Sequence, residues 1–370
     1  MNHEELVALD HQYAMQTYGR FDVDIDHGKG ATLYDLAGKE YIDFSSGIGV
    51  NSIGYGNEKW VAAITAQAQK LGHISNLFYS QPYAQLAQTL CRRTGMAAAF
   101  FGNSGAEANE GIIKMARKYS FDKYGKGRGT IITLKNSFHG RTITTLTATG
   151  QDVFHNYFFP FTDGFRYAQA GSIDAIQEVA GHDVCAVMLE LVQGEGGVYP
   201  MDPEYVHNLA VLCAERDWLL LVDEVQTGVG RTGTLFAFQQ YGILPDAVSF
   251  AKGIAGGLPM GGNPICAAAA QVVLDILDED ALAAVTEKGD YIRTRIAHMG
   301  LSSLGESRGL GLMIGVEVKG EESNKVLAAR LIQHGLLVLT AGTALRLLPP
   351  LTITMAEIDK GLAILEQTLV

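Results

Sequence analysis

Short apolar runs alternate with helical patterns along the middle of the chain. The stretches between the runs carry apolar residues at helical spacing, three and four positions apart. This alternation is typical of a mostly parallel sheet wrapped by helices, which is an α/β fold. The expected strands are 97–101, 130–134, 186–191, 219–222 and 247–251, and the clearest helices are 106–119 and 203–216, the latter with Asp202 as N-cap and Pro203 at its first position.

The segments on either side of this region follow other patterns. Alternating residues at 31–44 surround an Ala37-Gly38-Lys39 turn, which predicts a small hairpin. After Asn263 we expect helices at 267–278 and 282–299, strands at 310–318 and 336–339, and a last helix that starts after Thr354 with a capping box to Glu357. We therefore predict an N-terminal arm and hairpin over 1–53, a large domain over 54–262, and a small α+β domain over 263–370 that packs with the arm.

Composition narrows the class of protein. The 370 residues are 47% hydrophobic and 18% charged, as in an ordinary globular enzyme with a substantial core. A formal net charge of −12, with no long basic run, argues against a nucleic-acid partner. The four cysteines are far apart, so neither a zinc site nor a disulfide framework is expected. No targeting signal or membrane-length apolar run is evident, and we expect a cytoplasmic location.

One lysine and one aspartate end neighbouring apolar runs. Lys252 follows 247–251 directly, and Asp223 follows 219–222. Parallel strands deliver their carboxyl ends to one edge of a sheet, so the two charges can meet there. Pyridoxal phosphate chemistry requires such a pair: the amine forms a Schiff base with the cofactor aldehyde, and the carboxylate keeps the pyridine nitrogen protonated. A lysine at the surface end of a strand is the plainer alternative.

Two glycine-containing motifs compete as phosphate sites. Ser104 and Glu107 form a capping box after an expected strand, and Gly105 and Ala106 leave backbone N–H groups open to a phosphate. The run 228–233 has the spacing of a dinucleotide-binding motif. Its context is wrong, because it neither follows its strand directly nor opens a helix. We therefore favour the site at Ser104 and expect no nicotinamide or flavin cofactor.

Several runs together make the chain resemble class III pyridoxal-phosphate aminotransferases, which have fold type I. Within that family it is most similar to the enzymes that act on acetylornithine. The resemblance spans the chain in family order and implies a pyridoxal 5'-phosphate-dependent aminotransferase with a mostly parallel central sheet. The matching runs are 102–109, Asn136-Ser137-Phe138-His139-Gly140-Arg141-Thr142, Gln193-Gly194-Glu195-Gly196-Gly197-Val198, 222–233, Ala251-Lys252-Gly253 and Leu345-Arg346-Leu347-Leu348-Pro349-Pro350.

The resemblance also implies roles for individual residues. Lys252 would bind the cofactor and act as the base, and Asp223 would pair with the pyridinium. Gln226 would approach the ring hydroxyl, with Phe138 stacked on the ring and His139 beside it. The phosphate would be held by Ser104, Gly105 and Ala106, and the substrates would be recognised by Arg141, Arg346, Glu195, Tyr18, Val50 and Asn51.

Arg141 and Arg346 each offer a bidentate fork to a substrate carboxylate. The resemblance implies that Glu195 pairs with Arg346 when the amino donor is bound and releases it for 2-oxoglutarate. We expect transfer of the δ-amino group of N-acetylornithine to 2-oxoglutarate by a ping-pong mechanism, in arginine biosynthesis, and a homodimer with a shared active site. Ornithine, succinylornithine or 4-aminobutyrate as donor, an isomerase or decarboxylase on the same scaffold, and a catalytically inert scaffold remain alternatives.

One departure from the family stands at Gly261-Gly262. Relatives carry a further strand there and a loop whose threonine reaches the partner subunit's cofactor phosphate, whereas this sequence continues directly to Asn263-Pro264. A true deletion would remove a phosphate ligand and would have to rejoin the sheet edge to the next helix without strain. We therefore expect that the protein has a further segment here, which the 370-residue sequence does not include. The mass of the intact polypeptide distinguishes this from a true deletion.

Overall fold

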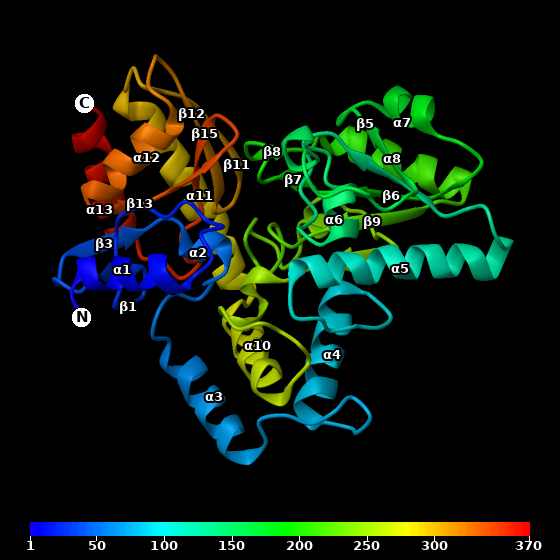
Figure 1. The fold of residues 1–370 in the computed structure, drawn as a ribbon, viewed down its shortest axis with the longest axis horizontal. Helices are drawn as coiled ribbons and strands as arrows, with labels where there is room; N and C mark the ends of the chain where they lie inside the picture. The colour runs from blue at the N-terminus through cyan, green and yellow to red at the C-terminus, as the bar shows by residue number, and fades with distance from the viewer.

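A five-stranded parallel sheet forms the centre of the larger lobe in the computed structural model, which describes all 370 residues (Figure 1). Every neighbouring pair in this sheet is parallel, as the alternating pattern predicts. The α/β fold expected from the sequence is therefore confirmed. The strand order is β10 (Ala247–Ser249), β9 (Leu219–Asp223), β6 (Val184–Leu189), β4 (Thr130–Leu134) and β5 (Phe165–Ala168).

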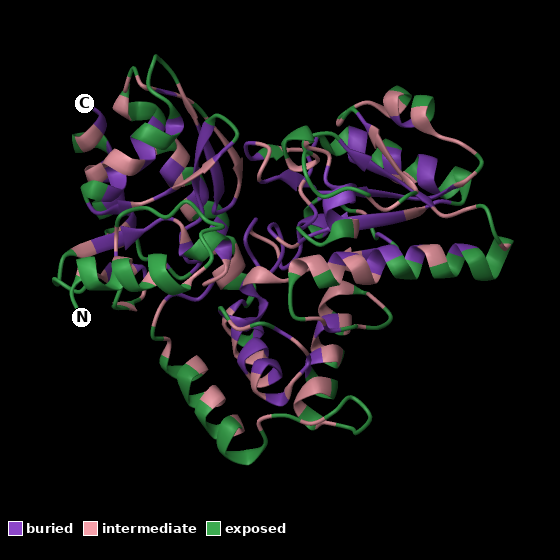
Figure 2. Cartoon of the chain, in the orientation of Figure 1, coloured by how far each residue is buried: buried purple, intermediate pink, exposed green.

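Helices cover both faces of this sheet, which explains why its strands read as continuous apolar runs. Helix α5 (Gly105–Tyr124) packs Ile112 and Ile113 against Ile131 and Met188 on one face. Helix α8 (Pro203–Arg216) packs against the other face. The central strands β4 and β6 are buried along their full length (Figure 2).

The smaller lobe combines the two ends of the chain. Its antiparallel sheet has the order β11 (Leu304–Leu310), β12 (Met313–Val318), β15 (Ala344–Leu347) and β14 (Leu339–Ala341). A second sheet contains β1 (His27–Lys29), β2 (Thr32–Tyr34), β3 (Glu40–Asp43) and β13 (Leu336–Leu337). Strands β2 and β3 form the expected hairpin, and β3 pairs in parallel with β13, which ties the N-terminal arm to the C-terminal lobe. The residue boundaries of the three domains stay a prediction.

The remaining elements connect and cover these sheets. The capping interactions expected at Asp202 and at Thr354 with Glu357 are both present. No helix is long and apolar enough to cross a membrane. The other elements are α1 (His3–Tyr13), α2 (Ser46–Gly49), α3 (Glu58–Lys70), α4 (Gln81–Thr94), α6 (Ile143–Ala148), η1 (Asp152–Phe154), α7 (Ile173–Val179), β7 (Val192–Gln193), β8 (Tyr199–Pro200), α9 (Ala237–Gln240), η2 (Lys252–Ala255), α10 (Pro264–Ile276), α11 (Glu279–Met299), α12 (Asn324–Gln333) and α13 (Met355–Leu369).

Three strand predictions were wrong in their detail. The expected strand 97–101 pairs with no other strand. The expected single strand 310–318 is instead the turn and second strand of the β11–β12 hairpin, because Gly311 has a φ of +50° that reverses the chain. The run 336–339 is divided between β13 and β14, which belong to different sheets.

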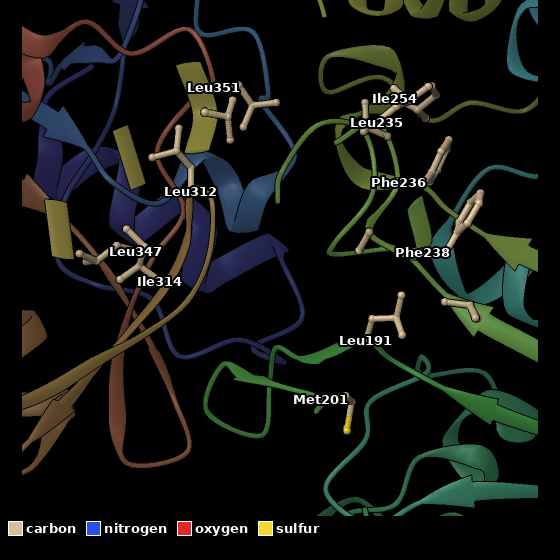
Figure 3. Close-up of a cluster of buried hydrophobic side chains, with 14 of the residues drawn as sticks. Leu191, Met201, Leu235, Phe236, Phe238, Ile254, Leu312, Ile314, Leu347 and Leu351 are labelled. Atoms are coloured by element: carbon tan, nitrogen blue, oxygen red, sulfur yellow. The ribbon is translucent and has the colours of Figure 1, made fainter. Parts of the chain in front are cut away.

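The glycine-rich run 228–233 has a structural role. Its Arg231 is fully buried and donates hydrogen bonds to the carbonyl oxygens of Leu312 (3.1 Å) and Pro349 (2.5 Å) in the small lobe and to the Ser46 hydroxyl (3.4 Å). Hydrophobic side chains of both lobes belong to one cluster of buried residues, part of which is drawn in Figure 3, with Leu312, Leu347 and Leu351 on one side and Leu235, Phe236 and Ile254 on the other. The run opens no helix, as expected from its context.

Candidate active site

A cavity of about 340 Å³ lies at the carboxyl ends of β9 and β10. Because β9 and β10 are parallel, with Ser249 in register with Asp223, the residues that follow both strands reach the same edge. Lys252 and Asp223 both line the cavity, as the sequence predicts. The predicted residues in its wall are Val50, Ser104, Gly105, Ala106, Phe138, His139, Asp223, Gln226 and Lys252.

Asp223 is a buried carboxylate in the cavity wall. Only 3% of it is exposed. Its Oδ2 accepts hydrogen bonds from Asn109 Nδ2 (2.7 Å) and lies 2.8 Å from His139 Nδ1, and its Oδ1 accepts from the backbone N–H of Val225 (2.9 Å). A buried carboxylate requires such partners. The carboxylate is thus fixed in position and presented to the cavity.

The N-terminus of α5 forms another part of the wall. Ser104 is the N-cap and accepts from the Glu107 N–H, while the Glu107 carboxylate binds the Ser104 hydroxyl and the Asn103 N–H. The N–H groups of Gly105 and Ala106 are in the first turn, where no intrahelical acceptor exists. A Cβ at Gly105 would lie 2.6 Å from Val225, so glycine is required for the helix to approach the end of β9 this closely.

Lys252 opens the short helix η2 with a left-handed backbone, at a φ of +38°. Burial lowers the pKa of its amine, while the negative charge of Glu195 acts in the opposite direction. The lowered pKa increases the fraction of neutral amine, which is the nucleophilic and basic form.

Arg346 and Glu195 form the expected ion pair, with 2.6 Å between Nη1 and Oε1. The same Nη1 donates to Gln226 Oε1 (3.1 Å), which connects the pair to the cavity wall. Arg346 is 3% exposed, and its Nε is buried without a hydrogen-bond partner. The guanidinium therefore keeps one donor unpaired.

Of the six predicted substrate residues only Val50 lines the cavity, and five do not. Arg346 and Glu195 adjoin the wall through the hydrogen bond of Arg346 to Gln226. Arg141 is exposed, and its guanidinium is 5.9 Å from the ring centres of Phe138 and Phe154. Tyr18 is 66% exposed on the arm. Asn51 is partly buried and does not line the cavity.

Two buried residues were missed by the sequence reasoning. Asn109 donates to both Asp223 and the His139 carbonyl, and its Oδ1 accepts from Ser249. Glu190 accepts from the Phe138 N–H (2.9 Å), and burial together with the nearby charge of Asp223 raises its pKa well above the usual value. For Asn109, the only sequence signal was its place in the matched run 102–109. No sequence signal pointed to Glu190.

Comparison with known proteins identifies the family. The model of the aminotransferase class-III family matches residues 13–261 and 260–369. The chain belongs to the class-III aminotransferases. It is thus a pyridoxal-phosphate-dependent aminotransferase, and the resemblance seen in the sequence is confirmed.

Individual class-III relatives match over their full length. Acetylornithine aminotransferase of Haemophilus ducreyi is 46% identical over 392 aligned positions, which cover 100% of this chain and 99% of the relative. N-acetylornithine aminotransferase of Stenotrophomonas maltophilia has a TM-score of 0.85 at 36% identity, covering 98% of each chain. Ornithine aminotransferase of Toxoplasma gondii, solved with partial occupancy of PLP at its active site, has a TM-score of 0.95 at 29% identity, covering 100% of this chain and 94% of that one.

The cavity fits the cofactor that class-III aminotransferases use. Pyridoxal phosphate carries an aldehyde, a ring nitrogen and a phosphate, and these match an amine with a lowered pKa, a fixed carboxylate and a helix N-terminus. All three protein groups line one cavity.

We predict a pH-dependent stability from Glu224, the fully buried neighbour of Asp223. Burial raises the pKa of Glu224 to about 7 from an ordinary value of 4.5. Between these values the folded protein holds a proton that the unfolded chain has released, so stability falls as pH rises. The loss attributable to this group is about 3 kcal/mol. Urea unfolding from pH 4.5 to 7.5 measures it.

The Glu224→Gln variant should be less stable than the wild type. It should also lose the part of the pH dependence of stability that comes from Glu224. In the wild type the N–H groups of Ala237 and Phe238 donate to the Glu224 carboxyl group. The glutamine amide would place its own N–H donors against them. Glu215→Gln, on the exposed surface of α8, is the matched control and should keep the wild-type slope. Parallel slopes for Glu224→Gln and the wild type would contradict the assignment.

Proposed function

We propose that this protein transfers the δ-amino group of N-acetylornithine to 2-oxoglutarate, giving N-acetylglutamate semialdehyde and glutamate, in arginine biosynthesis. The observation that carries the proposal is full-length identity of 39–46% to acetylornithine aminotransferases of several organisms. The ion pair between Arg346 and Glu195 supports a site that binds two different substrates in turn.

Asp223 would keep the cofactor ring nitrogen protonated. Asn109, His139 and the Val225 N–H already bind three of its acceptor positions, so its remaining lone pair has a fixed direction. When bound, pyridoxal phosphate supplies the electron sink that stabilises the carbanion of the substrate. Phe138 and His139 would line the ring, Gln226 would contact its hydroxyl, and Ser104, Gly105 and Ala106 would hold the phosphate.

Lys252 would hold the cofactor covalently and, once the substrate amine has displaced it, take up the proton of the substrate carbon at Nζ. A neutral amine is required for both tasks, and burial of this amine favours that form. Amines, carboxylates and imidazoles placed in this way contribute about 10² to 10⁴ in rate.

Arg346 would bind the α-carboxylate of 2-oxoglutarate after exchanging its bond to Glu195. The side chain of Glu195 is 28% exposed and that of Arg346 is 4% exposed, so the carboxylate is the partner that can move away at lower cost. Arg141 would bind the α-carboxylate of the amino donor, with Val50, Asn51 and Tyr18 along the donor pocket.

We also propose a homodimer with a shared active site. Consecutive side chains between α3 and α4 are apolar and strongly exposed: Leu77 (89%), Phe78 (63%) and Tyr79 (109%). Tyr157 and Phe159 are 81% and 68% exposed. Aromatic residues are enriched at protein interfaces, and exposed apolar groups of this size indicate a covering partner. Tyr18 and Asn51 would complete the donor pocket in the assembled dimer.

A cytoplasmic location is part of the proposal. Cys91, Cys185, Cys213 and Cys266 are all free thiols. A reducing compartment keeps thiols in this state.

The donor preference is tested by glutamate formation from 2-oxoglutarate with acetylornithine, ornithine, succinylornithine and 4-aminobutyrate. We expect the highest kcat/KM with acetylornithine. A rate with 4-aminobutyrate that is orders of magnitude higher would overturn the choice of donor. No glutamate with any donor, and no bleaching of the cofactor absorbance, would favour the inert scaffold.

The Lys252→Ala variant should lose turnover by about a thousandfold or more and should still bind the cofactor noncovalently. Glutamate formation measures the first effect, and cofactor absorbance after gel filtration measures the second. Lys70→Ala, at an exposed position of α3, is the control and should behave as the wild type. Turnover of Lys252→Ala at the wild-type rate would show that another group is the base.

The dimer is tested by light scattering during gel filtration. The wild type should elute with twice the subunit mass of 39.8 kDa. The double variant Leu77→Asp and Phe78→Asp should elute with the mass of one subunit, because two charges would be buried at the interface. Val211→Asp, at a 57% exposed apolar position of α8, should remain a dimer. A wild-type protein that is active with the mass of one subunit would contradict the proposal.

A further inference from the structure

Ser249 carries a buried hydroxyl group beside the candidate active site, and the proposed mechanism does not use it. It is the last residue of β10 and lies in register with Asp223 at the end of β9. Only 2% of it is exposed. Its carbonyl oxygen accepts from the Glu224 N–H (2.8 Å), which ties its backbone to the residue that follows Asp223. A hydroxyl buried at this place requires a hydrogen-bond partner.

The partner is the amide of Asn109, in the second turn of α5. The amide Nδ2 lies 2.7 Å from two oxygens, Asp223 Oδ2 and the His139 carbonyl oxygen. Neither a carbonyl group nor an ionised carboxylate can donate, so the amide must present its NH₂ group to them. Its Oδ1 consequently faces the Ser249 hydroxyl, which donates to it at 2.5 Å. Hydrogen bonds at both ends of the amide therefore set its orientation.

The other hydrogen bonds of Asp223 also come from donors. His139 Nδ1 lies 2.8 Å from Oδ2, and His139 Nε2 is buried with no hydrogen-bond partner. A hydrogen at Nε2 would be a buried donor without an acceptor, so the ring hydrogen is assigned to Nδ1. The Val225 N–H donates to Oδ1. Donors favour the ionised form of a carboxylate, and of these groups the Asn109 amide is the one that could turn an oxygen toward it instead.

We propose that Ser249 is a positioning residue for the cofactor: its hydroxyl holds the Asn109 amide so that Asp223 presents a fixed, ionised oxygen to the ring nitrogen. This inference rests on the role of Asp223 in the proposed function. Without the hydroxyl, Asn109 Oδ1 would be a buried acceptor with no donor. The amide could then turn, and Asp223 would lose one of the donors that hold it ready for a cationic ring. Binding of the ring nitrogen would weaken, although Ser249 does not line the active-site cavity.

The test compares pyridoxal phosphate with the analogue in which a CH group replaces the ring nitrogen. The aldehyde and the phosphate are the same in both compounds, so the ratio of the two dissociation constants isolates the contribution of the ring nitrogen. The full chain is freed of cofactor and titrated with each compound, and binding is followed by absorbance. We expect the wild type to prefer pyridoxal phosphate by roughly tenfold or more, the scale of a hydrogen bond to a charged group.

The Ser249→Ala variant should lower this preference by about fivefold or more, because it leaves a buried acceptor unpaired. Ser249→Thr keeps the hydroxyl, is suited to a strand, and should restore the wild-type preference. The matched control is Ser120→Ala. Ser120 is 3% exposed in α5, but its hydroxyl donates to the Arg128 carbonyl (2.6 Å) and it lies outside the cavity wall. The control should keep the preference even where it lowers the stability of the protein.

A double variant tests whether the hydroxyl acts through the amide. Asn109→Ala should itself lower the preference, and adding Ser249→Ala should lower it no further. Independent losses from the two changes would overturn the proposal, as would an unchanged preference in Ser249→Ala or an equal loss in Ser120→Ala. A wild type that binds both compounds equally would refute the role of Asp223, and the proposal with it. None of these measurements depends on turnover, so the choice of amino donor is judged separately.

Discussion

The burial of one carboxylate organises the site. Asp223 is at the end of a central strand with almost no exposure, where an unpartnered charge would cost several kcal/mol. Its hydrogen bonds come from α5 through Asn109, from the loop after β4 through His139, and from the loop after β9 through Val225. Satisfying this charge therefore brings together the segments that carry the phosphate-binding and ring-binding residues.

The same charge sets the electrostatics around it. Burial raises the pKa of Glu190 and of Glu224, and the charge of Asp223 adds to both shifts. Burial and Arg346 lower the pKa of Lys252, and Asp223 acts together with Glu195 and Glu190 to limit this lowering. The positions of Asp223 and Lys252 follow from the register of β9 and β10, in which Ser249 is opposite Asp223. The register of the two strands thus helps to determine the pKa of Lys252.

Sequence patterns predicted the central sheet well because strands buried on both faces have continuous apolar runs. They failed at 97–101, where Ala97, Ala98 and Phe100 are exposed and no strand pairs with the segment, because an apolar run alone specifies neither burial nor a partner strand. In the site, residues that the sequence groups in one motif, such as Ser104 to Ala106, line the cavity together. Contacts such as that of Asn109 with Asp223 join positions 114 apart and require the fold itself.

Lys252 has a consequence for the stability of the whole protein. A side chain with a left-handed backbone costs about 1 kcal/mol or more, and glycine would avoid that cost. Its amine is also held where burial opposes its charge. The residue that the chemistry requires is thus one that the local backbone disfavours. The packing of the surrounding protein therefore has to offset the conformational cost at this one position.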